Sequence, residues 1–236
     1  MFKIIQAHEY EANASLLEQM YRLRKRVFAD QLAWKVPHDG VCERDEYDGL
    51  RPAYLVWCDA AGTTLYGSAR LMPTTAPTLL LDTFHATMPK DVDLCAPGIW
   101  ECTRLCIDEA AIERDFPAVT AKKAFSTMLV AICEAAHSYG LETIISNHEP
   151  HVARLYRAAG ATFDELGRAD GYGKRPVCCS AFEISDASLA RMRSAVGIEG
   201  ALLVDRYASQ SSTALEHLVA RSARPTHRPT DLRQAA

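Results

Sequence analysis

The chain has 236 residues, of which 48% are hydrophobic and 24% charged, and it carries a formal net charge of −4 at pH 7. These values are typical of a globular protein, and the length allows one large domain or one domain with appendages. The acidic balance gives no support for a general nucleic-acid-binding protein. No stretch approaches the roughly 18 uncharged apolar residues that a membrane-spanning helix needs.

The N-terminus and the cysteines favour a cytoplasmic protein without membrane insertion. The first residues, MFKIIQAHEYEANASLLEQM, do not form a signal peptide, because their apolar run is short and acidic residues follow at once. The eight cysteines are therefore expected to be reduced and mostly in the core. Cys102 and Cys106 are close in sequence, but no second Cys/His pair stands at zinc spacing, so we expect no metal site.

Hydrophobic periodicity and turn residues predict the secondary structure in chain order. The expected elements are a strand at 2–7, a helix at 11–30, a loop at 31–52, strands at 53–59, 64–73 and 98–108, a helix at 118–139, a strand at 141–147, a helix at 150–159, and strands at 161–167 and 177–185. This order favours an α+β fold, an α/β/α sandwich with a mixed sheet, over a doubly wound parallel sheet.

The expected domain organisation has three parts. Residues 1–185 form the main domain, and 186–221 form a C-terminal helical extension with a second helix near 213–219. Residues 222–236 are basic and rich in proline and small residues, which is typical of a loosely ordered tail.

The loop at 31–52 and its flanks carry unusual side chains. Arg24 and Phe28 are four residues apart, so they share one face of the predicted helix, at the border of its apolar stripe. A loop of this length in a compact domain is usually functional or disordered, and Trp34 argues against disorder. We therefore expect this region to border a pocket.

A dense acidic cluster follows in the same loop, and its members are Glu43, Asp45, Glu46 and Asp48. An EF-hand calcium loop is excluded, because counting from Glu43 the sixth residue is not glycine and the twelfth, Tyr54, is not glutamate. A solvated acidic loop remains one interpretation. In the other, some carboxylates pair with arginines and others contact a cationic substrate.

Two arginines, Arg70 and Arg104, lie inside predicted strands. Arginine is rarely buried without a partner, so the sequence predicts buried ion pairs with the nearby carboxylates. Glu101 and Arg104 have opposite parity, and a regular strand would direct them to opposite faces of the sheet. If both serve one cleft, a β-bulge must lie between them.

In register along the chain, these residues resemble the LuxI-type N-acyl-homoserine lactone synthases. The resemblance covers about 1–185 and rests on the blocks RxxxFxxxxxW, ExDxYD and ExxR. The matching residues are Arg24, Phe28, Trp34, Glu43, Asp45, Asp48, Arg70, Phe84, Glu101 and Arg104. It implies a fold similar to the GNAT acetyltransferases, a twisted mixed sheet flanked by helices with a cleft where central strands splay apart.

The resemblance also implies a reaction. An enzyme of this family joins S-adenosylmethionine, used as a substrate and not as a cofactor, to an acyl group carried as a thioester on an acyl-carrier protein or on coenzyme A. The products are an N-acyl-L-homoserine lactone, methylthioadenosine and the free carrier. The chain lacks the glycine-rich phosphate loop of ordinary GNAT enzymes, which favours a carrier-protein donor. No cofactor is expected, and the sequence leaves the oligomeric state open.

Roles for individual residues follow from the resemblance. Glu101, with Arg104 and Glu43, is expected in the catalytic centre, Glu101 as the base that takes the proton of the attacking amine, directly or through water. A backbone N–H near Thr103 or Arg104 is expected to stabilise the oxyanion. The other members of the pocket for S-adenosylmethionine are Arg24, Phe28, Trp34, Asp45, Asp48, Arg70, Phe84 and Thr103.

Within this pocket the expected tasks differ. Phe28 and Trp34 offer aromatic faces to the adenine or the sulfonium. Asp45 and Arg104 contact the substrate amine and carboxylate. The remaining charged residues, Arg24, Glu43, Asp48 and Arg70, hold the loop in place by ion pairs.

The acyl end of the site is expected against the helix at 118–139 and the strand at 141–147. Candidate pocket residues are Met128, Leu129, Ile132, Ile144 and Ser146, the last near the position where the resemblance associates a hydroxyl with 3-oxo chains. Candidate docking residues for an acidic carrier protein are Lys122, Lys123, Arg154 and Arg157, although an exposed helix face explains them equally well.

Two other functions remain open from the sequence alone. One is a GNAT-type N-acyltransferase that acts on another small amine. The other is an inactive binding module on the same fold, against which the presence of Glu101 and both strand arginines argues.

Overall fold

The computed structural model describes residues 1–90 and 92–204, and Met1–Leu203 form one compact unit. Its elements in chain order are β1 (Phe2–Ile5), η1 (Ala7–Glu9), α1 (Ala14–Arg24), η2 (Lys25–Gln31), η3 (Glu46–Leu50), β2 (Ala53–Cys58), β3 (Leu65–Pro73), α2 (Leu79–Asp82), η4 (His85–Thr87), β4 (Ile99–Ile107), α3 (Glu109–Asp115), α4 (Ala121–Ser138), β5 (Thr143–His148), η5 (Pro150–Val152), α5 (Ala153–Ala158), β6 (Phe163–Ala169), β7 (Val177–Glu183) and α6 (Asp186–Val196).

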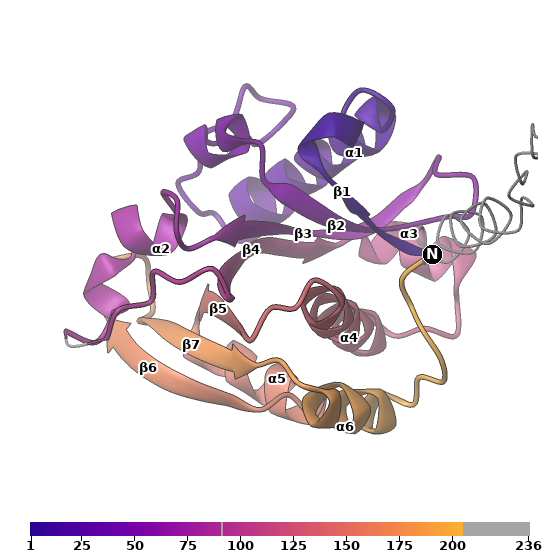
Figure 1. Cartoon of the computed structure of the whole chain (residues 1–236). Helices are drawn as coiled ribbons and strands as arrows, with labels where there is room; N and C mark the ends of the chain where they lie inside the picture. Colours follow the sequence, from indigo (N-terminus) through magenta and orange to yellow (C-terminus); the bar gives the residue numbers. More distant parts are fainter. Residues whose placement is uncertain (91, 205–236) are drawn as a thin grey trace, which may run out of the picture. The chain divides into compact units, whose positions relative to one another are not determined.

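The strands form one mixed sheet in the order β1-β2-β3-β4-β5-β7-β6. The β4–β5 pair is parallel, and the other neighbouring strands in this order run antiparallel. Helix α1 lies on one side of the sheet, and α4 and α6 lie on the other (Figure 1). The predicted mixed sheet flanked by helices is therefore confirmed.

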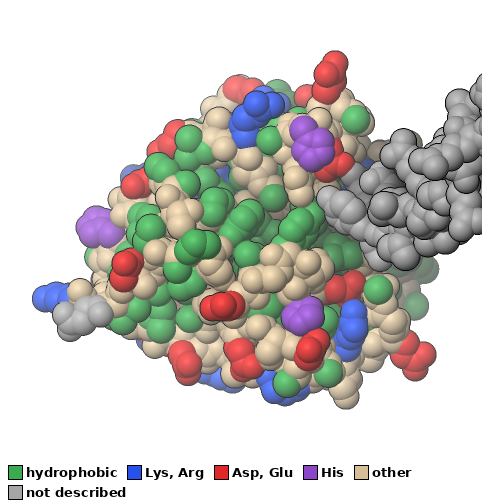
Figure 2. Space-filling view, in the orientation of Figure 1, with side chains coloured by type: hydrophobic (Ala, Val, Ile, Leu, Met, Phe, Trp, Pro, Cys, Tyr) green, Lys and Arg blue, Asp and Glu red, His purple; other side chains and the backbone are tan. Residues whose placement is uncertain are grey.

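Strand alternation divides the core between the two faces of the sheet. On β2, Tyr54 and Val56 join the apolar cluster beneath α1, whereas Leu55 and Trp57 join the larger cluster beneath α4 and α6. The face viewed in Figure 2 has hydrophobic side chains gathered across its middle and charged side chains mainly around its edge. No helix among the described residues is long and apolar enough to cross a membrane.

Strands β4 and β5 separate after a short paired stretch. They pair from Ile99 with Thr143 as far as Glu101 with Ile145, and both strands then continue without pairing to each other. The expected cleft between splayed central strands is therefore present, and Glu101 is the last paired residue on its β4 side.

A β-bulge follows Glu101 on the same strand. Arg70 pairs with Thr103 and Ser68 pairs with Cys106, so two residues of β4 oppose one residue of β3. Arg104 is one of these two residues of β4 and has a φ of 54°, in the left-handed region that a non-glycine residue rarely adopts. The expected bulge is present, but it begins at Arg104 itself.

Two short helices differ from the sequence-based expectations. Helices α2 and α3 were not expected, because four and seven residues are too few to show a clear period. Helix α6, the first part of the expected helical extension at 186–221, packs on α4 within the compact unit. The second helix expected near 213–219 and the tail at 222–236 lie outside the described residues.

Candidate active site

Six charged side chains that the sequence singled out come together as a closed ring of ion pairs. In order around the ring they are Glu43, Arg24, Asp48, Arg70, Asp45 and Arg104, which returns to Glu43. The charges alternate in sign, so each member contacts two partners of opposite charge and the sum is zero. We call these six side chains the charge ring.

Arg24 anchors one half of the charge ring from the C-terminal end of α1. Its Nη1 and Nη2 donate to the two carboxylate oxygens of Asp48 at 2.8 and 2.9 Å, and its Nε donates to Glu43 at 2.5 Å. This fork-to-fork geometry is the strongest form of a charged hydrogen bond. The loop is held against α1 as well, because the Glu43 N–H donates to the Tyr21 carbonyl at 3.0 Å.

Two strand arginines close the other half. Arg70 donates through Nη1 to Asp45 and, at 3.1 Å, to Asp48, and its Nε donates to the Thr103 hydroxyl at 3.0 Å. Arg104 donates through Nη2 to Asp45 at 2.9 Å. The bulge is what directs Arg104 to this face of the sheet, so that Arg104 and Glu101 do serve the same side.

The charge ring is buried, and its charges stabilise one another. The side chains of Arg24, Glu43 and Arg70 have no exposed surface. Burial alone would raise the pKa of the Asp48 carboxyl, but the hydrogen bonds and charge of Arg24 and the charge of Arg70 hold it well below its ordinary value. The Tyr54 hydroxyl adds a further hydrogen bond to Asp48 at 2.7 Å.

Asp45 and Arg104, which are expected to contact the substrate amine and carboxylate, are paired as fully as the residues expected to hold the loop. The division of tasks within the charge ring stays a prediction. One N–H donor of the charge ring is left without a partner. It is Nη2 of Arg70, which is buried and has no hydrogen-bond partner among the described residues.

Glu101 lies beside the charge ring at the point where β4 and β5 separate. It is fully buried, and its carboxylate accepts the backbone N–H groups of Leu79 and Leu80 at 3.0 and 2.8 Å. Burial raises the pKa of Glu101 to about 7, although the Leu80 N–H, the Arg70 charge, the Leu79 N–H and the Thr78 hydroxyl all act to lower it. Glu101 therefore has the raised pKa that a base working near neutral pH requires.

The two expected aromatic residues form a stack at the edge of the charge ring. The rings of Phe28 and Trp34 lie 5.3 Å apart at 25°, and the Arg104 guanidinium lies 5.5 Å from the centre of the Phe28 ring. Phe28 is buried in the π-helical turn η2, whereas Trp34 is 41% exposed. Phe84 lies apart from this stack, in the apolar cluster around Leu80.

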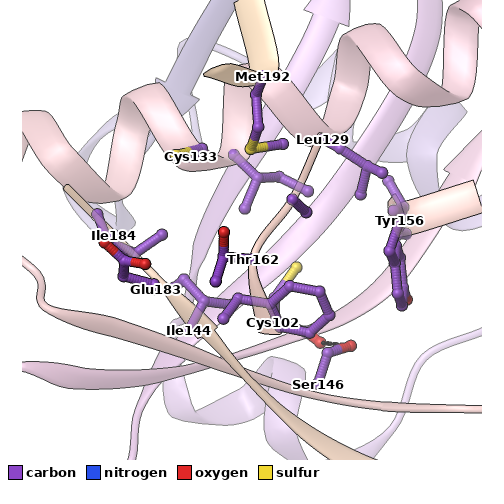
Figure 3. A pocket seen from close by; sticks show the side chains of 14 residues that line it. Cys102, Leu129, Cys133, Ile144, Ser146, Tyr156, Thr162, Glu183, Ile184 and Met192 are labelled. Atoms are coloured by element: carbon purple, nitrogen blue, oxygen red, sulfur yellow. Dashed lines mark hydrogen bonds between the residues drawn. The ribbon is translucent and has the colours of Figure 1, made fainter. Parts of the chain in front are cut away.

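An apolar cavity lies on the opposite face of the sheet, between β4, β5, β7 and the helices α4, α5 and α6 (Figure 3). Its cavity volume is about 50 Å³, which is small beside the roughly 300–1,000 Å³ of pockets that hold drug-sized molecules, so a bound chain of any length requires the lining side chains to move. Four of the five predicted acyl-pocket residues line it, namely Leu129, Ile132, Ile144 and Ser146. The Ser146 hydroxyl donates to the Cys102 carbonyl at 3.0 Å, at the splayed end of the cavity.

Met128 differs from the other four candidate acyl-pocket residues. Met128 is fully buried but does not line the cavity, because successive helix residues point about 100° apart and Leu129 takes the cavity side. The sulfur of Met128 instead lies against β3, only 3.1 Å from the position that a Cβ at Gly67 would occupy. The sequence also missed Tyr156, Phe182 and Met192, which line the cavity from three other elements.

Comparison with known proteins identifies the family of this chain. A model of the family described as autoinducer synthase matches residues 8–192. The chain belongs to the autoinducer synthase family.

Curated relatives match the sequence of this autoinducer synthase over most of their length. The chain is 33% identical over 171 residues to an acyl-homoserine-lactone synthase of Rhizobium etli, covering 72% of this chain and 78% of that protein. It is 33% identical over 183 residues to one of Ralstonia nicotianae, covering 77% and 86%. The predicted class of enzyme, an acyltransferase of the acyl-homoserine-lactone synthase type, is confirmed in preference to an N-acyltransferase for another amine.

Solved structures support the fold. The CoA-dependent acyl-homoserine lactone synthase MesI matches with a TM-score of 0.74 at 23% identity, covering 87% of this chain and 100% of that one. BjaI, solved with SAM and isopentyl-CoA, matches with 0.73 at 22%, covering 91% and 99%. A putative N-acetyltransferase of Lactobacillus plantarum matches with 0.50 at 19%, covering 78% and 99%, which agrees with the expected GNAT-like sheet.

The candidate docking residues of this autoinducer synthase lie on the expected helices. Lys122, Arg154 and Arg157 are exposed, and the Arg157 guanidinium lies 5.2 Å from the centre of the Phe163 ring. Lys123 donates from Nζ to the Val196 carbonyl, so it secures the end of α6. A role for these residues in docking stays a prediction.

No group of three or more His, Cys, Asp or Glu side chains in the described part of the chain is arranged to hold a metal ion. The eight cysteines all lie in this described part and form no disulfides, and all except Cys95 are buried.

Proposed function

We propose that this protein makes an N-acyl-L-homoserine lactone from S-adenosylmethionine and an acyl thioester. The observation that carries the proposal is the position of Glu101. This buried carboxyl, with a pKa raised to about 7, lies on the charge-ring face of the sheet at the point where β4 and β5 separate, and the apolar cavity lies on the opposite face. In this proposal the two substrates meet through the gap between the strands.

S-adenosylmethionine is proposed to bind on the side of the charge ring. The exposed Trp34 ring, stacked on Phe28, offers a face to the adenine or to the sulfonium. The free Nη2 donor of Arg70 suits the substrate carboxylate, because a buried guanidinium N–H without a partner is costly and a carboxylate would satisfy it. The charge ring has no net charge, so its stability does not depend on a charged substrate.

In the first step, the substrate amine attacks the thioester carbonyl, and the C–N bond forms as the C–S bond breaks. Glu101 takes the proton that the amine loses, directly or through a water, and the departing thiolate is protonated to a thiol. An α-amino group has a pKa of roughly 7.7–8.0, so a base with a pKa near 7 is far better matched to it than an ordinary glutamate near 4.3. We assign stabilisation of the oxyanion to a backbone N–H near Thr103 or Arg104.

In the second step, the carboxylate oxygen of the same substrate attacks its γ-carbon and displaces methylthioadenosine. The leaving group departs neutral because the sulfur begins as a sulfonium, so this step needs neither a cofactor nor a metal. No cofactor is part of the proposal, and S-adenosylmethionine is consumed.

The acyl group is proposed to occupy the apolar cavity, with Ser146 at the end nearest the reacting carbonyl. Both kinds of donor remain in the proposal. The missing glycine-rich phosphate loop favours an acyl-carrier protein, and the solved relatives MesI and BjaI are described as CoA-dependent. The proposal includes a cytoplasmic location, where both substrates are supplied by metabolism.

The test is release of methylthioadenosine. The purified protein is incubated with S-adenosylmethionine and a panel of acyl-carrier and acyl-CoA donors, and methylthioadenosine and the lactone are measured by mass spectrometry. Methylthioadenosine formation that requires one donor class supports the proposal and identifies the donor. Absence of methylthioadenosine with every donor would refute it.

A further inference from the structure

The side-chain amide of Asn147, on β5, is held in one orientation. Its Nδ2 donates to the Thr87 hydroxyl at 3.0 Å, whereas its Oδ1 is buried and has no hydrogen-bond partner among the described residues. Thr87 fixes this assignment, because its hydroxyl donates its one hydrogen to the Phe84 carbonyl at 2.7 Å and can only accept from Asn147. The atom left over is therefore the carbonyl oxygen, and a buried acceptor without a donor is costly.

Asn147 lies on the same face of the sheet as Glu101. Side chains alternate along β5, so Ser146 faces the apolar cavity while Asn147 points to the other side, as Ile145 does. Ile145 packs with Leu80 of α2, and the Leu80 N–H donates to Glu101 at 2.8 Å. The proposed base and the amide oxygen are therefore on one face.

Asn147 also borders the gap between β4 and β5. The two strands stop pairing two residues earlier, so Thr103 on β4 and Asn147 occupy equivalent positions on the two sides. The gap is narrow here, because one residue before this level the Ser146 hydroxyl donates to the Cys102 carbonyl at 3.0 Å. The Arg70 guanidinium reaches the other side of the same gap, since its Nε donates to the Thr103 hydroxyl at 3.0 Å.

Two buried polar atoms on this face thus have no partner among the described residues, and they are of opposite kind. Nη2 of Arg70 is a donor, and Oδ1 of Asn147 is an acceptor. The head group of an amino acid offers the matching pair, a carboxylate that accepts and an amino group that donates. Asp45, expected to contact the amine, already accepts from Arg70 and Arg104, one at each carboxylate oxygen.

We propose that Oδ1 of Asn147 binds the α-amino group of S-adenosylmethionine while Nη2 of Arg70 binds its carboxylate. The inference rests on the proposed function and adds a residue to its substrate site. A neutral amide accepts an N–H from the amine in its charged and in its neutral form. Unlike a carboxylate, it adds no negative charge that would hold the amine in the charged form, so the amine remains able to lose its proton to Glu101.

The sequence contains asparagine only at positions 13 and 147, which allows a direct test by NMR. Protein labelled with ¹³C and ¹⁵N at asparagine is saturated with S-adenosylmethionine, and the two side-chain signals are told apart by the loss of one in Asn13→Ala. The Cγ resonance of Asn147 should shift, because its carbonyl gains a hydrogen bond. Asn13, which pairs with Lys3 and the Glu9 carbonyl, is the internal control and should not shift.

Calorimetry without an acyl donor measures the effect on affinity. Asn147→Ala should weaken S-adenosylmethionine binding by about tenfold or more, as expected for a hydrogen bond to a charged group. The loss should persist with decarboxylated S-adenosylmethionine, which keeps the amine, and disappear with the analogue that lacks the α-amino group. Thr87→Val is the matched control, because it loses the bond between Asn147 and Thr87 but keeps the amide oxygen, so affinity should fall far less.

Three results overturn the inference. They are an unshifted Asn147 Cγ resonance in the saturated protein, an equal loss of affinity in Asn147→Ala for the substrate and for the analogue without the amine, and an equal loss in Thr87→Val. Should Asn147→Ala not fold, the NMR experiment on the unaltered chain still decides. The proposed function survives these results if methylthioadenosine is formed, whereas an unaltered protein that does not bind S-adenosylmethionine refutes both.

Discussion

Breaking the charge ring at Asp48 should destabilise the protein strongly. Asp48 accepts two hydrogen bonds from Arg24, one each from Arg70 and the Tyr54 hydroxyl, and one from the Asp45 N–H. Asp48→Asn keeps the shape but turns one acceptor into an NH₂ group that meets donors. It also leaves a buried ring with one excess positive charge.

The expected cost is about 3–5 kcal/mol, the range for removing one partner of a buried ion pair. For a domain of this size that corresponds to a fall of roughly 6–20 °C in the melting temperature. Urea and thermal unfolding at pH 7, followed by circular dichroism, measure both quantities. The matched control is Glu18→Gln, whose exposed pair with Arg22 at 2.7 Å should contribute less than about 1 kcal/mol.

The contribution of Asp48 to the free energy of unfolding should change with pH in a defined direction. The folded-state pKa of Asp48 is depressed below its unfolded value, so its contribution is fully present above the unfolded pKa near 3.9. It is lost as the pH falls from there through the folded pKa. The difference in stability between the unaltered protein and Asp48→Asn should therefore be constant near neutral pH and shrink in acid.

Two results would contradict the reasoning. One is a loss of less than about 1 kcal/mol in Asp48→Asn, which would mean that water or relaxation replaces the lost charge. The other is an equal loss in Glu18→Gln, which would mean that burial of the charge ring has no special weight.

The remaining predictions concern the site. Glu101→Gln should lower turnover by roughly a hundredfold or more while S-adenosylmethionine binding, measured by calorimetry, stays nearly unchanged, and the turnover of the unaltered protein should rise with pH through about 7 as Glu101 ionises. Trp34→Ala should weaken S-adenosylmethionine binding with little loss of stability, because the ring is 41% exposed; loss of folding in thermal melts would contradict this. Met192→Ala and Met128→Ala should both lose about 2–5 kcal/mol, but only the first should change the preference among acyl donors, since Met192 alone of the two lines the cavity.

Local patterns were enough to predict most of the sheet and α4. Alternation and β-branched residues predicted every strand, and Gly140, with a φ of 69°, ends α4 as expected. The short helix α3 was missed, although its N-cap Asp108 accepts the Ala111 N–H at 3.1 Å. An acidic N-cap before an alanine-rich turn was the signal that could have revealed it.

The site was predicted as a set of residues but not as a geometry. The sequence indicated which arginines and carboxylates would pair, yet which oxygen faces which nitrogen depends on the bulge at Arg104. The contact between Glu101 and the start of α2 joins residues about twenty positions apart and has no local signal. The position of Met128 away from the cavity has the same origin, because periodicity does not fix the rotation of a helix about its axis.

The closed form of the charge ring has an evolutionary consequence. Since every member balances two neighbours, a single replacement leaves an odd charge in the interior, and a viable descendant has to acquire a compensating change. The cavity residues on the opposite face lack this constraint, because an apolar side chain can be exchanged for another of similar volume at modest cost. If the two faces bind the substrates as proposed, the acylated signal can diverge within one lineage by small steps while the side chains on the charge-ring face stay fixed.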